Sequence, residues 1–477
     1  MVSCINLSSG SVLGAALSLS VTTMGAGILT LPSAYADAGV ITATLLMLFI
    51  AIMTVYSVDF IVHGVEKLGL NSYEELTREL FGRKAEEFVR VALISYNIGS
   101  AISYLVVTGD ILAPLHPILS QYVSILLTPR HTLFLYWMLF VLPLSCIPNL
   151  GSLHAISFFA IISTSLISCM VVYRYFVPNS PQATDSINNN GKVSFVGNSQ
   201  ANAVAWWWGT NPLLAIPIFM FSFDCQSLVF QIYAGLDNMR RSTMFTVATL
   251  SLIVSSTIHG AVGLFGYLTN PTDVRENIIN NYDPTSDKLF AVGYAIYVIP
   301  INLAFVLLLF PIRDSIFILW YGYSKASVAT HVPQPKRFVR IVDEEERLEH
   351  LALLNAGNST DVESETLLHE MQMKKKYYND IETISMRDHL LVSISLSTFS
   401  IAVALFIPNI VSIIAPLGAV CSSTLCFMVP GLYRWKLHQL GISRYASVLE
   451  RVEVIILIAF GIIAGVVGTI VSIIEYF

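Results

Sequence analysis

The chain has 477 residues, of which 55% are hydrophobic and 12% are charged. Soluble domains carry about a quarter charged residues, so this chain has too little polar surface to face water, and its composition predicts a membrane protein. The formal net charge is −6, and no clustered basic face lies outside the short loops, which argues against nucleic-acid binding.

Hydropathy predicts an all-α polytopic membrane protein with eleven transmembrane helices, because a helix needs about 20 apolar residues to cross the hydrocarbon core. Residues 1–36 contain no Lys, Arg, Asp or Glu, so the first span lacks the positive region of a signal peptide and is expected to be retained. The fourth span is the shortest and contains Pro143. The predicted spans are 12–36, 39–63, 88–113, 132–148, 153–177, 210–234, 243–268, 289–320, 389–408, 409–433 and 452–475.

The positions of Lys and Arg predict the orientation of these spans. Among the short connections, the loop 64–90 and the loops after the sixth and tenth spans are the most basic. Basic loops stay in the cytoplasm, so we expect the N-terminus inside and the C-terminus outside or in a lumen. The polar segment 178–209 is then an external loop, and the charged segment 321–388 is cytoplasmic.

Two glycines and a proline interrupt the first span, in the run from Thr22 to Pro32. Unwound backbone at membrane depth is tolerated only where it is buried or lines a cavity. The freed N–H groups of Gly25 and Gly27 would suit an anion such as a carboxylate. A tight helix-packing face is an equally good interpretation of this motif alone.

The sixth span is also interrupted, by Pro212 and Pro217 before a polar pair, Asp224 and Gln226. Broken helices at corresponding positions of two halves indicate the binding site of a secondary transporter. The first span opens one set of five spans and the sixth opens another. The sequence therefore predicts a transporter with two five-helix halves and one extra helix.

Five runs of residues, in order along nearly the whole chain, resemble the amino acid/auxin permease family, which includes the system A and N neutral amino acid transporters and many vacuolar ones. The runs begin with Gly25-Ala26-Gly27-Ile28-Leu29, with Leu31-Pro32 just after it. The others are Pro217-Ile218 with Phe221-Ser222-Phe223 and Cys225, His259 to Leu268, Phe310 to Ser315, and Ile407-Pro408-Asn409-Ile410 with Gly418-Ala419 and Pro430.

This resemblance implies an inverted repeat like that of the bacterial leucine transporter, with the substrate between the first, third, sixth and eighth spans. The predicted organisation is a short cytoplasmic N-terminus and two five-helix repeats separated by the external loop, followed by an eleventh helix. The corresponding ranges are 1–11, 12–177, 178–209, 210–433 with the loop 321–388 inside it, and 452–475.

The candidate substrate-binding residues come from the two broken spans and from two neighbouring spans. Tyr104, in the third span, is the candidate hydroxyl that completes the carboxylate pocket, and Phe223 is the candidate apolar wall. The full set is Thr22, Met24, Gly25, Ala26, Gly27, Tyr104, Phe221, Ser222, Phe223, Asp224 and Asn302.

The same resemblance bears on ion coupling. Sodium-coupled members carry an Asn four residues before the first glycine of the motif and a Thr about six residues before the Phe-Pro-Ile-Arg run. This chain has Val21 and Ala304 at those positions. Two side-chain oxygens are thus missing, which puts sodium in doubt and favours a coupling proton or facilitated exchange. We expect no metal site and no other cofactor.

Ionisable residues within spans are candidates for function. Asp224 is the strongest of these, because it lies at the predicted break and needs a substrate cation, a proton or a hydrogen-bonded partner. Asp59, Asp110 and His154 are expected near the membrane interfaces, and Arg313 and Asp314 are expected to form a gating or structural ion pair. His259 is either a proton relay or a hydrogen-bonded structural histidine.

The predicted function is secondary active transport of amino acids, with neutral substrates favoured over cationic ones. The alternatives are a basic amino acid carrier and an amino acid sensor that signals through the loop 321–388. No zinc motif, nucleophile elbow or catalytic aspartate pair is visible, so an enzyme is not expected.

Two sequences in the cytoplasmic loop resemble acidic dileucine sorting signals. They are Glu349 followed by Leu353-Leu354, and Glu363 followed by Leu367-Leu368. A clathrin adaptor is therefore a candidate partner, beside the amino acid substrate and the lipid bilayer. The expected location is the plasma membrane or an endolysosomal or vacuolar membrane.

Overall fold

In the computed structural model, the described residues are 10–70, 72–122, 128–147, 153–177, 204–321, 385–407 and 409–476, and these contain helices but no β-strand. The chain divides into two units. One unit comprises Met1–Pro311 and Ser393–Phe477, and the other comprises Ile312–Val392. The all-α prediction is confirmed for the described part of the chain.

Nine of the eleven predicted spans appear among the described residues as helices long and apolar enough to cross a membrane, if the bent first pair counts as one span. The first is built from α1 (Val12–Thr23), a short 3-10 helix η1 (Ala26–Thr30) and α2 (Leu31–Ala38). The others are α3 (Val40–Leu68), α5 with η2 (Arg83–Leu112 and Ala113–Leu115), α9 (Leu153–Phe176), α11 with α12 (Pro212–Ser222 and Gln226–Gly235), α13 (Arg241–Thr269), α14 (Lys288–Tyr321), α19 with η5 and α20 (Val411–Leu417, Gly418–Met428 and Val429–Gln439), and α21 (Val448–Tyr476).

The fourth and ninth predicted spans are helical but fall short of that test, so the number eleven stays a prediction. The fourth consists of α7 (Pro129–Tyr136), the π-helical η3 (Trp137–Val141) and α8 (Leu142–Ser145). The ninth is α18 (Met386–Ala404), whose first turn carries Asp388. The two segments meet at Ser397, whose Oγ accepts from Trp137 Nε1 at 2.9 Å and lies 3.4 Å from Ser145 Oγ.

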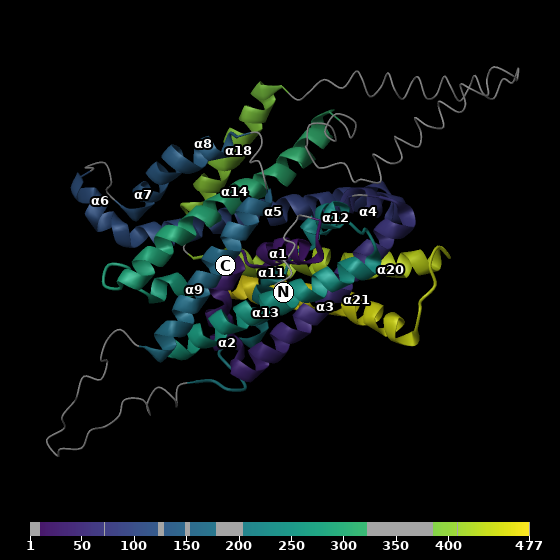
Figure 1. The fold of residues 1–477 in the computed structure, drawn as a ribbon, viewed down its shortest axis with the longest axis horizontal. Coiled ribbons are helices and arrows are strands. Elements are labelled where there is room, and N and C mark those ends of the chain that lie inside the picture. The colour runs from purple at the N-terminus through teal and green to yellow at the C-terminus, as the bar shows by residue number, and fades with distance from the viewer. Residues whose placement is uncertain are drawn as a thin grey trace, which may run out of the picture. The chain divides into compact units, whose positions relative to one another are not determined.

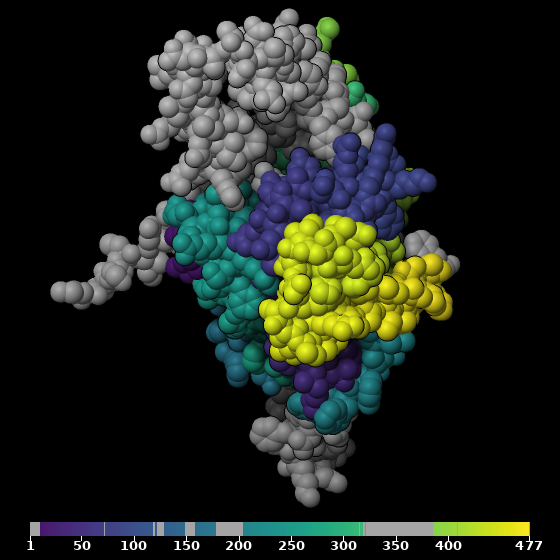
Figure 2. Space-filling model, turned by 90° about the vertical axis from the view of Figure 1, so that its right-hand side faces the viewer, coloured from purple at the N-terminus to yellow at the C-terminus, as the bar shows by residue number. Residues whose placement is uncertain are grey.

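Shorter helices lie outside the spans. They are α4 (Tyr73–Phe81), α6 (His116–Tyr122) and η4 (Ile278–Asn281). The amphipathic α4 is capped by Ser72, whose hydroxyl accepts from Glu75 N–H at 3.1 Å, and it packs against α5 and α20. Figure 2 shows the C-terminal helices, in yellow, against the purple-blue residues of this region.

The core of the first unit is formed by the broken helices and the long α13. The helix α13 packs along α1, α2, α3 and α9, and α11 packs against α2, α19 and η5. These contacts put α1, α11 and α13 at the centre of the unit (Figure 1). Close backbone approach requires glycine here, because a side chain at Gly418 would collide with the Pro217 carbonyl oxygen.

Residues 204–211, at the end of the predicted external loop, fasten the junction between α2 and α3. Gly39 turns the chain there with a φ of +84°, a conformation that favours glycine. The Val40 and Ile41 N–H groups donate to the carbonyls of Ala205 (2.9 Å) and Trp206 (2.8 Å). The loop therefore satisfies backbone donors that the start of α3 would leave unpaired.

A buried ion pair fastens the same side of the bundle between α9 and the start of α14. Arg174 Nε donates to Asp287 Oδ2 at 2.7 Å, and both side chains are about nine-tenths buried, at 10% and 8% exposed. Arg174 also donates to the Val177 carbonyl oxygen at 3.2 Å. The pair joins the fifth and eighth spans through charge and hydrogen bonds together.

Candidate functional site

The first span breaks between Thr23 and Ala26, where its two halves meet at a bend of 52°. The Met24 N–H still donates to the Ser20 carbonyl at 3.1 Å, and the Ile28 N–H donates to the Gly25 carbonyl at 3.4 Å. The amides of Gly25, Ala26 and Gly27 lie between these two bonds. The predicted unwinding of the first span is therefore present in the structure.

The glycines of this break touch the third and sixth spans. A Cβ built on Gly25 would lie 2.6 Å from Tyr104 Oη, and one built on Gly27 would lie 2.6 Å from Ser222 Oγ and 3.2 Å from Phe221 Cδ1. The Tyr104 hydroxyl also interacts with the backbone of Ala26. The structure thus brings together five predicted residues around a point where the backbone lacks side chains.

The sixth span breaks at residues 223–225, between α11 and α12. Pro217 lies inside α11, and a proline removes one helical hydrogen bond. The Phe223 N–H still donates to the Phe219 carbonyl at 3.2 Å. Because Ser222 and Phe221 precede this break and face Gly27, the two interrupted spans meet at their interruptions.

Asp224 turns away from that meeting point, toward the π-helical η5. Its Oδ2 accepts from Ser422 Oγ at 3.0 Å, and its carboxylate also interacts with the Cys426 thiol. The side chain is 4% exposed, and no cationic group is among the interactions of the carboxylate. A buried carboxylate needs such donors, because isolated burial of its charge is very costly.

The remaining predicted residues lie at varying distances from the break. Thr22 Oγ1 donates to the Leu19 carbonyl at 2.7 Å, one turn earlier in α1. Met24 and Ala26 are buried in the break itself, at 5% and 3% exposed. Asn302 faces the fourth span instead, because its Nδ2 donates to Tyr136 Oη at 2.9 Å, while its Oδ1 has no hydrogen-bond partner.

Three residues of this region were not predicted as site residues. Ser422 and Cys426 hold Asp224, and Ser57 of α3 accepts from Gln226 Nε2 at 3.1 Å. Ser422 and Cys426 lie on an eleven-residue π-helix, a rare geometry that recurs at functional sites. The sequence carries no marker for it, since Gly418-Ala419 indicates only close packing.

Comparison with known proteins decides the family. A model of the transmembrane amino acid transporter protein family matches residues 8–474. The chain belongs to this family. Vacuolar amino acid transporter 6 of Saccharomyces cerevisiae is 25% identical over 426 residues, which cover 88% of this chain and 89% of the yeast protein. A structure described as a substrate-bound, outward-open Na+-coupled sialic acid symporter aligns over 97% of this chain and 90% of its own, with 15% identity and a TM-score of 0.47.

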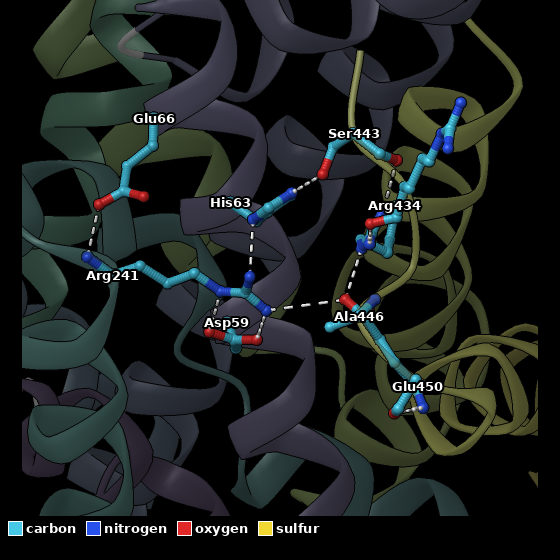
Figure 3. A network of polar contacts seen from close by, with 10 residues as sticks. Asp59, His63, Glu66, Arg241, Arg434, Ser443, Ala446 and Glu450 are labelled. Atoms are coloured by element: carbon cyan, nitrogen blue, oxygen red, sulfur yellow. Dashed lines mark hydrogen bonds and ion pairs between the residues drawn. The ribbon is translucent and has the colours of Figure 1, made fainter. Parts of the chain in front are cut away.

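The transporter is a multi-pass membrane protein, and its predicted cytoplasmic loops meet in one polar network (Figure 3). Arg241, at the start of α13, donates from Nε to Asp59 Oδ1 at 2.7 Å and from Nη1 to His63 Nδ1 at 2.8 Å. Since His63 Nδ1 accepts, His63 Nε2 carries the proton and donates to Ser443 Oγ at 2.8 Å. Asp59, predicted near an interface, is thus half of a buried ion pair.

A second ion pair continues the network across the last two spans. Arg434 Nε donates to Glu450 Oε1 at 2.7 Å, and Arg434 is 1% exposed. Glu450 also lies 3.8 Å from Arg241. The network therefore connects α3, α13, α20 and α21 on the side where the sequence places the basic loops.

The other ionisable candidates lie away from the two breaks. Asp110 accepts from Asn277 Nδ2 at 2.6 Å on the opposite side of the bundle, as expected for an interfacial residue. In the second unit, Arg313 Nη1 lies 3.2 Å from His389 Nε2. The side chains of His154 and Asp314 and the dileucine sequences are outside the described residues.

Proposed function

We propose that this transporter moves neutral amino acids by alternating access and binds the substrate carboxylate between the broken parts of its first and sixth spans. The observation that carries this proposal is the contact of Gly27 with Ser222, because it joins the two interruptions in one site. Backbone N–H groups without helical partners are suited to a carboxylate. The Tyr104 hydroxyl, beside Gly25, is a further donor for the same group.

The proposed architecture is two inverted five-helix repeats, 12–177 and 210–433, with one extra helix at 452–475. The breaks in the first and sixth spans support it, since each break lies in the opening span of its repeat. Transport then proceeds by movement of one repeat against the other around a site near the bilayer midplane.

We further propose that the driving ion is a proton. Val21 and Ala304 provide no side-chain oxygen at the positions where the resemblance implies sodium ligands. Two buried ionisable side chains, Asp224 and His259, lie next to the breaks, at 4% and 0% exposed. Either one is chemically able to take up and release a proton.

The proposed location is a vacuolar or endolysosomal membrane, with the plasma membrane as the alternative. The yeast relative is named as a vacuolar transporter, and the two dileucine sequences would be available to a clathrin adaptor in the cytoplasm. Transport or sensing is a separate question, because a sensor on the same fold would bind amino acids without moving them.

The experiment is uptake of a panel of radiolabelled amino acids by purified protein in proteoliposomes, at two pH values, with and without sodium. We expect saturable uptake of small neutral amino acids that rises with an inward proton gradient and is indifferent to sodium. Saturable binding without uptake would identify a sensor. Uptake that required sodium would refute proton coupling while leaving the carrier function intact.

A further inference from the structure

The helix α13 runs along both halves of the broken first span and meets each half with different residues. Toward α1, Ser251 Oγ lies 3.1 Å from Ser20 Oγ, and Ser255 Oγ lies 2.6 Å from Thr23 Oγ1. Toward α2, it presents glycines: a Cβ built on Gly263 would lie 2.5 Å from a ring carbon of Tyr35. The transition from hydroxyls to glycines coincides with the break.

His259 lies at that transition, one turn after Ser255 and one turn before Gly263. Its side chain is fully buried, at 0% exposed. Its ring packs edge-on against Phe223, with 4.9 Å between the ring centroids, and its polar neighbour is the backbone carbonyl of Thr23. Thr23 ends α1 and Phe223 follows α11, so one side chain touches both interruptions.

The ring of His259 is poorly satisfied for a buried polar group. Neither nitrogen makes a hydrogen bond of good geometry within the described residues. A buried donor or acceptor without a partner costs free energy, so a purely structural histidine would be expected to have found one. The alternative of a hydrogen-bonded structural histidine therefore does not describe this side chain.

The surroundings of His259 contain a feature that favours a cation. The C-terminal end of a helix carries partial negative charge, which stabilises cationic groups, and α1 ends at Thr23 beside the ring. No charged side chain in the described residues interacts with the ring. The ionisable groups on the elements packed around it are engaged elsewhere or lie at a distance: Asp224 with Ser422, Tyr35 with Thr44, Asp59 with Arg241, Arg174 with Asp287, and Cys169 and Tyr173 on the far side of α9's groove with α13.

We propose that His259 is the residue that binds the coupling proton, as an imidazolium whose ring N–H donates to the Thr23 carbonyl at the end of α1. This inference rests on the proposed proton-coupled transport and assigns the ion-binding residue within it. Asp224 suits that task less well, because its carboxylate already accepts from Ser422 and interacts with Cys426. Half-helix C-terminal ends serve as cation sites in broken-helix transporters, and here the cation is held on a side chain.

The proton balance is simple. A proton from one side of the membrane binds the free ring nitrogen, crosses as the N–H of the imidazolium, and leaves to the other side when the breaks rearrange. The contacts with Thr23 and Phe223 change in any movement that separates the two interruptions. Protonation and substrate binding are thereby coupled through the same pair of broken helices.

The test uses full-length protein in proteoliposomes loaded with a pH-sensitive dye. Proton entry and labelled amino acid entry are measured together for the wild type, His259→Gln and, as the matched control, Asp224→Asn. We expect His259→Gln to reduce substrate-driven proton entry about tenfold or more, because an amide does not take up a proton near neutral pH. Exchange of internal for external substrate should persist in the variant, and it shows that the protein is folded.

Three results would overturn the proposal, and they differ from one another. Unchanged proton entry in His259→Gln would free His259 of the role, and loss of proton entry in Asp224→Asn alone would give it to Asp224. Amino acid uptake by the wild type without any proton entry would instead refute proton coupling itself. His259→Asn, which is smaller and also neutral, provides a second variant should the glutamine side chain disturb folding.

Discussion

Ser222 Oγ occupies the space that a side chain at Gly27 would need, since a Cβ there would lie 2.6 Å from this oxygen and 3.0 Å from Ser222 Cα. Overpacking a buried contact of this kind costs about 1–3 kcal/mol. We therefore expect Gly27→Ala to lower the rate of transport at least several-fold and Gly27→Val to abolish it, with expression retained. Uptake and thermal unfolding of the purified protein measure the two effects.

The matched control for Gly27 is Gly235→Ala at the end of α12, where a Cβ would meet nothing within 4 Å. Ser222→Ala combined with Gly27→Ala should restore part of the lost transport, because it removes the nearest atom but leaves Ser222 Cα in place. Normal transport by Gly27→Val would contradict the packing of the two breaks described above.

Asp224→Asn tests the carboxylate at the second break. An amide accepts less well from both Ser422 and Cys426, so we expect uptake of neutral amino acids to fall by about tenfold, equivalent to roughly 1.4 kcal/mol, with its pH dependence retained. Ser422→Ala should cause a smaller loss in the same direction. A selective loss of affinity for cationic amino acids would instead show that Asp224 pairs with a basic substrate.

Arg241→Gln tests the network of Figure 3. Removing one partner of a buried ion pair costs about 3–5 kcal/mol, and we expect the low end of that range because the Arg241 side chain is 32% exposed. Thermal unfolding provides the measurement, with Arg240→Gln on the exposed neighbouring residue as the control. The double variant with Asp59→Asn should lose less stability than the two single losses added together, as coupled residues do.

Glu276, in the connection between α13 and α14, gives the transporter a pH-dependent stability. Burial, together with the negative charges of Asp37, Glu475 and Asp110, raises its pKa from 4.5 to about 7. The folded state therefore binds the proton more tightly than the unfolded state. Its stabilising effect is fully present below about pH 4.5 and is lost as the pH rises through about 7.

Thermal unfolding at a series of pH values checks this dependence. The wild type should melt at a higher temperature in mild acid than above neutral pH, and Glu276→Gln should flatten that part of the profile. A matched change at Asp273, which is 74% exposed, should leave the profile as it is. An acidic lumen would accordingly favour the folded state of this outer connection.

The dileucine sequences predict the location. Replacing Leu353, Leu354, Leu367 and Leu368 by alanine should move the transporter from an internal membrane to the cell surface, because cytosolic adaptors would no longer bind it. Surface biotinylation and microscopy of the tagged protein measure the shift. An unchanged distribution would remove the basis for a clathrin adaptor as partner.

The sequence predicted the helices of the long apolar spans and both interruptions, because glycine, proline and polar residues within apolar segments have direct effects on the backbone. Gly25, Gly27, Tyr104 and Ser222 lie together in the structure. The partners of Asp224 were not predictable, since they depend on the π-helical winding of η5. Asp59 and Arg241 are 182 positions apart, and only the packing of α3 beside α13 brings them into contact.

The ion pair of Arg174 and Asp287 has a consequence for how the chain is made. The two residues are 113 positions apart, so the ribosome delivers the guanidinium long before its carboxylate. Until the eighth span is synthesised, the first five spans contain a cation whose final neighbour does not yet exist. The early helices must therefore wait in the membrane in a looser arrangement, and the arrival of Asp287 is the event that allows the outer end of the fifth span to take its final position.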